Sequence, residues 1–306
     1  MEYILETNGL TKIYGQKQAA VDVSLHIPEG TIYGLIGRNG AGKTTIMRMI
    51  SGLSHPTRGS YSLFGKTGYQ MDKMLKYVGV LIENPGLYPR LSAYENLKIK
   101  CIGAGINPKG YVEDLLKTIG LENTDMKKPA GSYSLGMRQR LGIGLALIGD
   151  PKLLVLDEPI NGLDPQGIAE VRQTLVKLRD EKGISIMISS HILDELAKVA
   201  DWFGIINEGT LLDEFSSDEL HHRCGQYVMI RTNKPSGTVK VLNGIGVEQV
   251  ETEPDGTLRV NGQLDHTPAI SRAIVDAGID LYEISLRSIS LEDYYLNVTK
   301  GGAHNG

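Results

Sequence analysis

The chain has 306 residues, enough for one large domain or two smaller ones, and an ordinary globular composition with 41% hydrophobic and 22% charged residues. Its net charge of −4 argues against nucleic acid as a partner, because nucleic-acid binding normally needs a basic surface. The N-terminus lacks the basic start and apolar core of a signal peptide. The longest apolar-and-glycine run, 141–149, is too short to cross a bilayer, so a membrane role requires a partner chain. Cys101 and Cys224 stand in no metal-ligand spacing, which favours a reducing, cytoplasmic setting.

The first half of the chain is predicted to begin β-rich and then become helical. Strands are expected at 3–6, 20–27, 31–36 and 60–65, and helices at 70–77, 93–102, 109–119 and 136–148. Next come an apolar strand at 152–157, a helix at 165–182, a strand at 184–189, a helix at 192–200 and a strand at 201–206. Alternation of this kind predicts an α/β sheet with parallel strands.

The pattern changes near residue 220, where a second domain is expected to begin. Strands are predicted at 227–231, 247–252, 257–260 and 281–287, with a helix at 268–277 that Thr267 caps. Ser290 and Asp293 resemble a capping box before a last helix. The sequence therefore predicts a small α+β domain over 226–300, and the tail at 301–306 is expected to be disordered.

A glycine-rich loop follows the strand at 31–36 and carries the most specific signal in the chain. It fits the pattern Gly, four residues, Gly-Lys-Ser/Thr, and reads Gly37-Arg38-Asn39-Gly40-Ala41-Gly42-Lys43-Thr44. Glycines let backbone N–H groups form an anion-binding nest, and the next helix directs its positive end to the same place. Lys43 is expected to reach the β/γ-phosphates and Thr44 to hold Mg²⁺. The alternative, a chance glycine-rich turn, is disfavoured by the strand–loop–helix context.

Two acidic residues close the apolar strand at 152–157. Carboxylates at the carboxyl end of a parallel strand lie where open α/β sheets bind ligands. Asp157 is expected to hold Mg²⁺, directly or through water, and Glu158 to polarise an attacking water beside the γ-phosphate. The alternative is an acidic cap of the following helix.

Three weaker signals complete the set. Ser134 and Gly136 open an apolar helix and predict a second anion site, although a plain serine cap explains them equally well. His191 follows the strand at 184–189 and is a candidate hydrogen-bond donor to the γ-phosphate, or a structural cap. Tyr14 lies before the glycine-rich loop and is suited to stack on adenine, or to pack in the core.

Together these residues resemble the nucleotide-binding subunit of an ABC transporter, over residues 2 to about 217. Tyr14 matches the adenine-stacking aromatic, and His191 matches the switch histidine. The remaining matches are the Walker A loop at 37–45, the signature at 134–137, Walker B with its catalytic glutamate at 153–158, and the D-loop Asn161-Gly162-Leu163-Asp164. The resemblance implies a P-loop NTPase of the ABC type over 1–220, with a β-rich N-terminal subdomain and a helical subdomain at about 84–150, followed by the small C-terminal α+β domain.

The resemblance also implies an activity and partners. Two copies pack head to tail, so that the Walker loop of one and the signature of the other enclose each ATP, and hydrolysis drives a separately encoded membrane permease. Glu158, His191 and Lys43 are the implied catalytic residues, and Thr44, Glu83 and Asp157 the implied Mg²⁺ ligands. The implied ATP-binding residues are Tyr14, Gly37, Arg38, Asn39, Gly40, Ala41, Gly42, Lys43, Thr44, Thr45, Ser134, Gly136, Met137 and Asp164. The chain is expected to lie in the cytoplasm, against the inner face of the membrane.

The chain departs from the family pattern at two places. Glu83 replaces the usual glutamine, and a carboxylate adds negative charge near the phosphates, so slower or more Mg²⁺-dependent hydrolysis is expected. In the signature, Tyr133, Leu135 and Met137 replace the usual Leu, Gly and Gln. The segments at 83–88, 91–97 and 290–296 resemble the ATPases of exporters that confer bacitracin and lantibiotic resistance.

Two other functions remain open at this point. One is a soluble ABC-type ATPase with a regulatory role; such proteins often carry two ATPase units, whereas this chain has one. The other is a module that senses ATP without turnover, which the presence of Glu158 and His191 disfavours.

Overall fold

The computed structural model describes residues 2–223, 226–247, 249–261, 266–288 and 290–301, and the chain divides into two compact units between Ser217 and Asp218. The first unit contains two sheets. A mixed six-stranded sheet has the order β10 (Thr210–Ser216), β9 (Trp202–Asn207), β4 (Ile32–Ile36), β8 (Ser185–Ser190), β7 (Leu153–Leu156) and β6 (Val78–Leu81). Its strands are parallel except for the β9–β10 hairpin.

The second sheet of this unit is antiparallel and consists of β1 (Tyr3–Tyr14), β2 (Lys17–Val23), β3 (His26–Pro28) and β5 (Arg58–Leu63). The predicted single strand at 20–27 is wrong, because the chain changes its pairing along β1 between β2 and β3. The buried Thr7 hydroxyl stabilises this break: it donates to the Val23 carbonyl at 2.9 Å and accepts from the Leu25 N–H at 2.9 Å.

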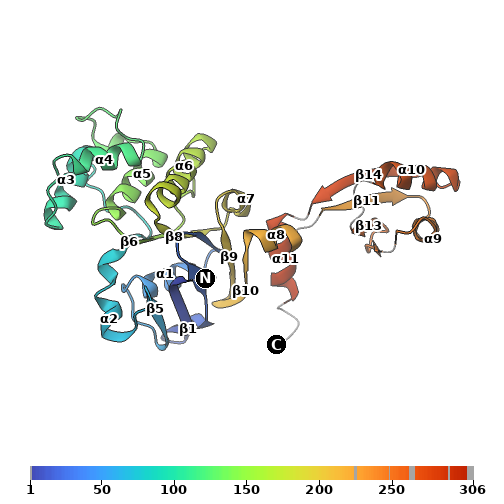
Figure 1. Cartoon of the computed structure of the whole chain (residues 1–306), viewed down its shortest axis with the longest axis horizontal. Helices are drawn as coiled ribbons and strands as arrows, with labels where there is room; N and C mark the ends of the chain where they lie inside the picture. The colour runs from blue at the N-terminus through green and yellow to red at the C-terminus, as the bar shows by residue number, and fades with distance from the viewer. Residues whose placement is uncertain (1, 224–225, 248, 262–265, 289, 302–306) are drawn as a thin grey trace. The chain divides into compact units, whose positions relative to one another are not determined.

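The helix α1 (Lys43–Ile50) and the antiparallel sheet lie on one side of the six-stranded sheet (Figure 1). Ile46, Met47, Met49 and Ile50 of α1 are buried in a core with residues of both sheets. The predicted helix at 70–77 is only partly correct: α2 (Gly68–Asp72) ends early, and a 3₁₀ turn, η1 (Leu75–Tyr77), leads into β6.

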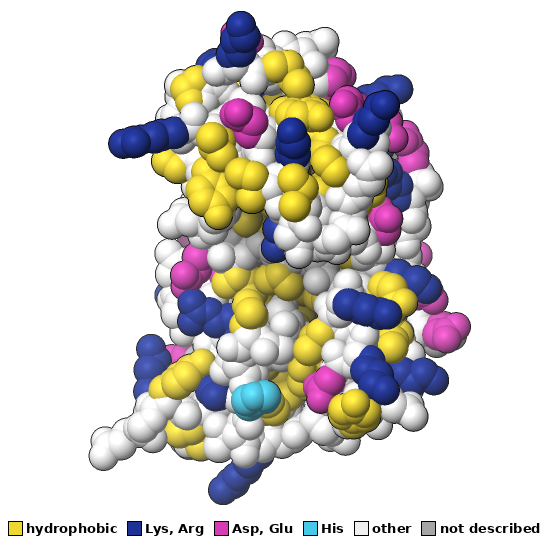
Figure 2. All heavy atoms as spheres, turned by 90° about the vertical axis from the view of Figure 1, so that its left-hand side faces the viewer, with side chains coloured by type: hydrophobic (Ala, Val, Ile, Leu, Met, Phe, Trp, Pro, Cys, Tyr) yellow, Lys and Arg dark blue, Asp and Glu magenta, His cyan; other side chains and the backbone are white. Residues whose placement is uncertain are grey.

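The other side of the six-stranded sheet is covered by helices (Figure 1). These are α3 (Ala93–Gly103), α4 (Tyr111–Thr118), α5 (Leu135–Ala146) and α6 (Pro165–Lys182), with a 3₁₀ turn, η2 (Ala130–Ser132), before α5 and a short α7 (Leu193–Ala197) after β8. The predicted helices at 93–102, 109–119, 136–148 and 165–182 are thus confirmed to within three residues. Figure 2 shows hydrophobic side chains gathered on the outer face of this unit, with lysines and arginines between them.

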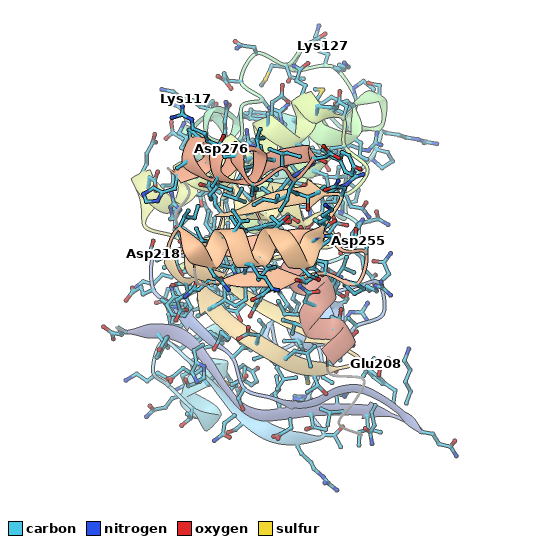
Figure 3. The ribbon with its side chains drawn as sticks, turned by 90° about the vertical axis from the view of Figure 1, so that its right-hand side faces the viewer. Lys117, Lys127, Glu208, Asp218, Asp255 and Asp276 are labelled. Atoms are coloured by element: carbon cyan, nitrogen blue, oxygen red, sulfur yellow. The ribbon has the colours of Figure 1, made fainter. Side chains whose placement is uncertain are left out.

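The second unit begins with α8 (Ser217–Arg223) at the boundary and continues as β11 (Gln226–Thr232), α9 (Pro235–Gly244), β12 (Val250–Thr252), β13 (Leu258–Asn261), α10 (Thr267–Asp276), β14 (Leu281–Ser288) and α11 (Leu291–Gly301). The four strands form an antiparallel sheet in the order β12-β13-β11-β14. A β-α-β-β-α-β sequence in this order is the ferredoxin-like arrangement. Helices α9 and α10 lie side by side on this sheet (Figure 3).

Three details of the second unit differ from or match expectation. Helix α9 was not predicted, because its sequence PSGTVKVLNG has low helix propensity; burial of Thr238 and Leu242 stabilises it instead. Thr267 is the first residue of α10 rather than its cap, which is His266. The capping box before α11 is confirmed, since the Asp293 N–H donates to the Ser290 Oγ at 3.0 Å and the Ser290 N–H donates to Asp293 Oδ2 at 3.1 Å.

In the part of the chain that the structure describes, no helix is both long and apolar enough to span a bilayer.

Candidate nucleotide-binding site

Three neighbouring parallel strands deliver the predicted site residues to one edge of the six-stranded sheet. In the β4–β8 register Ile36 lies opposite Ser190, and in the β7–β8 register Leu156 lies opposite Ile188. The glycine-rich loop after β4, the acidic pair after β7 and the polar end of β8 therefore meet at the carboxyl ends of the strands. Ligands of open α/β sheets bind at this edge.

The glycine-rich loop is held in place by strands far away in the sequence. Gly42 has a φ of +108°, and a Cβ on it would lie 2.4 Å from the Ala19 carbonyl oxygen of β2. A Cβ on Gly37 would lie 2.6 Å from the carbonyl oxygen of Ile206 in β9. Because the neighbours are backbone atoms, neither position has room for a side chain.

Lys43 is buried at the first residue of α1 and is 5% exposed. Its ammonium donates to the carbonyl of Gly37 at 2.6 Å and to that of Arg38 at 3.3 Å. It also lies 3.1 Å from Glu158 Oε1. A buried ammonium with these partners is a fixed positive charge facing the loop.

Asp157 is 7% exposed and joins the loop to the neighbouring strand. One carboxylate oxygen accepts from the Thr44 hydroxyl at 2.7 Å, and the other accepts from the Ser189 hydroxyl at 2.6 Å. The sequence analysis did not identify Ser189 as a site residue. The signal that could have identified it is its position: Ser189 is a polar residue near the end of an otherwise apolar strand that is expected to lie beside the strand of the acidic pair.

Glu158 lies between Lys43 and His191. Its backbone has a φ of +50°, an uncommon conformation for a residue with a side chain, and its N–H donates to the Ser189 Oγ at 2.9 Å. Its Oε2 lies 2.7 Å from His191 Nδ1. Its Oε1 is buried and accepts no hydrogen bond from any described residue, although Lys43 lies at ion-pair distance.

These residues surround a cavity of about 180 Å³. The predicted residues that line it are Asn39, Gly40, Gly42, Lys43, Thr44, Thr45 and Glu158. Lys17 and Ala19 of β2 also line it, and the sequence analysis missed them because nothing local marks them as site residues. Gly37 and Arg38 contribute through their carbonyls to Lys43, and the carbonyl of the buried Ala41 accepts from the Gly209 N–H at 2.9 Å.

The remaining predicted residues do not line this cavity. Tyr14 is 47% exposed, and the Lys12 ammonium lies 4.9 Å from its ring centre. Asp164 caps α6 by accepting from the Gly167 N–H at 3.0 Å, and Ser134 caps α5 by accepting from the Met137 N–H at 3.2 Å. Gly136 is buried where α5 meets α6, beside Gly167.

The signature segment is anchored by the tyrosine that replaces the usual leucine. Tyr133 is buried, and its hydroxyl accepts from the Ala93 N–H at 3.2 Å at the start of α3. Burial raises the pKa of the Tyr133 hydroxyl, so it remains neutral at physiological pH. The anchored backbone leaves Ser134 exposed at the amino end of α5.

Glu83, the third implied Mg²⁺ ligand, is held by a residue of α1. Its φ is +63°, its side chain is exposed, and it forms an ion pair with Arg48 of α1. Among the described residues, Thr44 and Asp157 are hydrogen-bonded to each other, whereas Glu83 is paired with Arg48.

The donor set suits Mg²⁺. A hydroxyl and a carboxylate oxygen are hard ligands, and proteins usually hold this ion with one or two carboxylates plus substrate phosphates. The described residues contain no group of three or more His, Cys, Asp or Glu side chains that could hold a metal by itself.

The fold and this site are those of an ABC-type ATPase. The chain matches the ABC transporter family over residues 20–161. It is 40% identical over 304 residues to a bacitracin transport ATP-binding protein of Bacillus licheniformis, covering 99% of both chains. It is 45% identical over 215 residues to a lantibiotic transport ATP-binding protein of Streptococcus pyogenes, covering 70% of this chain and 92% of that one.

A solved dimeric ATP-binding cassette, bound to ADP and Pi, has the same fold with a TM-score of 0.62 and 24% identity, covering 70% of this chain and 98% of that chain. The chain therefore belongs to the ATP-binding proteins of ABC transporters. It is a nucleotide-binding ATPase subunit, as the sequence predicted, and a purely regulatory role is not favoured.

Proposed function

We propose that this ATPase works as a head-to-tail homodimer on a separately encoded permease that exports bacitracin-like peptide antibiotics. The observation that carries the proposal is the polar network at the sheet edge. Lys43 is held by the Gly37 carbonyl and paired with Glu158, and Asp157 is held by the hydroxyls of Thr44 and Ser189. Preorganised charges of this kind are what phosphoryl transfer requires from a protein.

Each side chain of the network has a role that follows from its position. Lys43 and the loop N–H groups bind the phosphates, and Thr44 with Asp157 holds Mg²⁺, which neutralises phosphate charge. Glu158 orients the attacking water, because its side chain lines the cavity beside Lys43. The contact of His191 Nδ1 with Glu158 Oε2 at 2.7 Å fixes the orientation of this carboxylate.

The second half of the ATP site comes from a second copy. Ser134 is exposed at the start of α5, a helix of 12 residues, and it does not line the cavity of its own chain. A helix start offers free N–H groups to an anion. Tyr14, with its exposed ring, stacks on adenine beside the loop.

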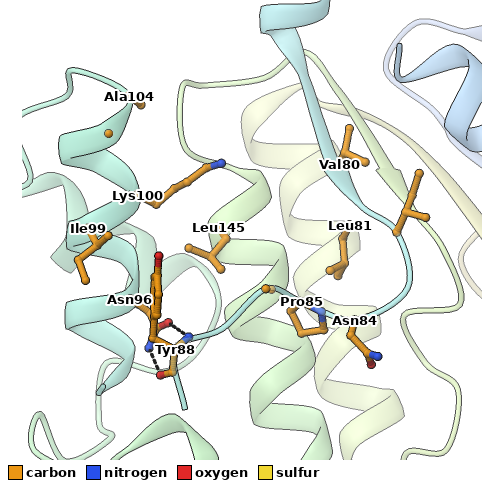
Figure 4. A pocket seen from close by; sticks show the side chains of 14 residues that line it. Val80, Leu81, Asn84, Pro85, Tyr88, Asn96, Ile99, Lys100, Ala104 and Leu145 are labelled. Atoms are coloured by element: carbon orange, nitrogen blue, oxygen red, sulfur yellow. Dashed lines mark hydrogen bonds between the residues drawn. The ribbon is translucent and has the colours of Figure 1, made fainter. Parts of the chain in front are cut away.

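The permease docks in a groove that borders the Glu83 loop (Figure 4). This groove encloses about 620 Å³ between β6, the loop that follows it, α3 and α5. Leu81, Pro85, Ile99 and Leu145 supply apolar walls, and Lys100 points across it. Ile99 is 42% exposed and Tyr88 is 56% exposed at its rim, which suits the apolar face of a partner helix. Docking here brings the chain to the cytoplasmic face of the membrane.

The rim of this groove is held by hydrogen bonds of one buried side chain, Asn96. The buried Asn96 side chain accepts from the Tyr88 N–H at 2.7 Å and donates to the carbonyls of Tyr88, Leu91 and Ser92. Because the loop that begins at Glu83 forms part of the groove wall, movement of the permease in the groove is transmitted to this loop.

The second unit favours bacitracin-like cargo over lantibiotics. The bacitracin relative matches this chain over its whole length, whereas the lantibiotic relative is matched over 92% of its own length by only 70% of this chain. The complete architecture is therefore shared with the former.

The proposal is tested by expressing the chain together with a permease encoded beside its gene in a host that is sensitive to bacitracin. Resistance to bacitracin is expected, and Glu158→Gln should abolish it. Resistance to a lantibiotic alone would contradict the proposed cargo, and resistance retained in Glu158→Gln would contradict the proposed role of hydrolysis.

A further inference from the structure

The sheet of the second unit has one guarded edge and one open edge. Strand β12 at one end has three residues, whereas β14 at the other has eight. Proteins usually protect long edge strands with charged residues, lysine above all, or with proline, because unpaired backbone groups attract other strands. The sequence of β14, LYEISLRS, contains neither lysine nor proline. The charged residues of β14, Glu283 and Arg287, are paired with each other. Among the described strands, β11 is the only one paired with β14.

The two sides of β14 differ in chemistry. On the helix-covered side, Ile284 packs against the core, while Tyr282 and Leu286 are 66% and 51% exposed. On the opposite side, Glu283 Oε1 accepts from the Arg287 guanidinium at 3.2 Å, and Arg231 of β11 lies 3.7 Å from the other carboxylate oxygen. Ser285 lies midway between Glu283 and Arg287.

We propose that β14 pairs antiparallel with β14 of a second copy, with the two-fold axis at Ser285. In this register Glu283 faces Arg287 of the second copy, and Ile284 faces Leu286 of the second copy. The pairing is therefore complementary in charge on one side and apolar on the other. It joins two four-stranded sheets into one of eight strands.

Charge selects this register over its neighbours. Residues directly opposite in an antiparallel pair lie on the same face of the sheet. The neighbouring registers therefore place the two-fold axis at the residue before or after Ser285. An axis at Ile284 would place Glu283 opposite Ser285 and Arg287 opposite Leu281. An axis at Leu286 would place Arg287 opposite Ser285. Neither brings opposite charges together.

The inference rests on the proposed homodimer for its setting, but the contact itself involves no nucleotide. A contact of this kind keeps two copies associated between rounds of hydrolysis, when the ATP-dependent interface opens. It can therefore be measured without ATP, independently of the hydrolysis on which the proposed function depends.

The first test uses the full chain with Cys101→Ala and Cys224→Ser, into which Ser285→Cys is introduced. Mild oxidation without nucleotide is expected to give a disulfide-linked dimer, because residues opposite in an antiparallel pair lie within disulfide reach. The matched control is Tyr282→Cys. Its thiol is more exposed, but the two copies of position 282 lie roughly 20 Å apart in this register. Linked dimer at position 285 should exceed that at position 282 by about ten-fold, and equal linking would overturn the proposal.

The second test reverses charges in trans. In the Ser285→Cys chain, Glu283→Arg alone and Arg287→Glu alone each place like charges opposite one another, so each should lose most of its linked dimer. A mixture of the two variants restores both opposite-charge pairs and should recover a heterodimer, identified by a size tag on one chain. A role for Glu283 within one copy would not be rescued by mixing. No recovery in the mixture, or a link from position 285 to the permease in place of a second copy, would overturn the proposal. The link forms without nucleotide, so failure of the parent chain to hydrolyse ATP would contradict the proposed function and leave the linking result readable.

Discussion

The six-stranded sheet of the first unit and the four-stranded sheet of the second unit place their polar groups differently. At the carboxyl edge of the six-stranded sheet, Lys43, Asp157 and Ser189 are buried. The Ser189 hydroxyl donates to Asp157, and the Lys43 ammonium donates to the Gly37 carbonyl. In the four-stranded sheet of the second unit, the buried side of the strands is apolar, with Val228, Ile230, Leu258 and Val260. Its charged residues lie on the opposite, solvent-facing side.

This difference separates a reactive sheet from a structural one. Buried charges cost free energy unless neighbours satisfy them, so a fold keeps them where chemistry needs them. Surface charges cost little and contribute little to stability, and they serve to select a partner. The first unit is therefore expected to respond to small polar changes at its sheet edge, and the second only at its open strand.

The largest effect is expected from Glu158→Gln. This change preserves the shape of the side chain but removes the negative charge that orients water, so kcat for ATP hydrolysis should fall by at least about 100-fold. ATP binding should persist, and gel filtration with ATP should show a trapped dimer. The matched control is Glu113→Gln on the outer face of α4, which should hydrolyse ATP normally. Normal turnover by Glu158→Gln would remove the distinction between the two sheets.

The next largest effect is expected from Asn96→Ala. The change leaves the Tyr88 N–H and several carbonyls without their partner, so the first unit should lose about 2–3 kcal/mol of unfolding free energy. This loss is measured by unfolding the protein in urea and monitoring the protease sensitivity of the first unit. Asn243→Ala, at an exposed position of α9 in the second unit, is the control and should change stability by less than about 0.5 kcal/mol. Similar losses for the two variants would contradict the comparison.

A smaller effect is expected from Glu83→Gln. The exposed ion pair with Arg48 contributes less than about 1 kcal/mol, so folding should be unaffected. Hydrolysis should stay the same or rise, because the amide removes negative charge near the phosphates. ATPase assays over a range of Mg²⁺ concentrations measure this. A large loss of activity would give the carboxylate a required role of its own.

The smallest effect concerns pH. Hydrogen bonds from the Ser92 backbone and side chain hold the pKa of Glu95 below its ordinary value of 4.5. A carboxylate whose pKa is lowered on folding stabilises the protein above its unfolded pKa, and that contribution is lost as pH falls through the folded pKa. Glu95→Gln should therefore lower the urea midpoint slightly at pH 7, and the difference from the parent should shrink below pH 4.5. A difference that grew on acidification would contradict the capping role.

The sequence was informative wherever the chemistry is local. The glycine-rich loop, the acidic pair after β7 and the capping box at Ser290 each lie within a few residues, and a single chain displays them. It was less informative about the ion pair of Arg48 with Glu83 and the hydroxyl of Ser189 on Asp157. These partners are 35 and 32 residues apart in the sequence, and they come together only because of the order of the strands in the six-stranded sheet. Helix α9 escaped prediction for another reason: packing of Leu242, not propensity, stabilises it.

Gly37 and Gly42 lie close to backbone carbonyls of other strands, β9 and β2. This affects how loss-of-function variants at these two positions are interpreted. Alanine at either position would press a methyl group against the backbone of β9 or β2, so the strands themselves would have to move. Cells that carry such a variant would contain less of the protein, as well as a poorer enzyme. Abundance must therefore be measured before a glycine variant in this loop is taken as evidence for a contact with nucleotide.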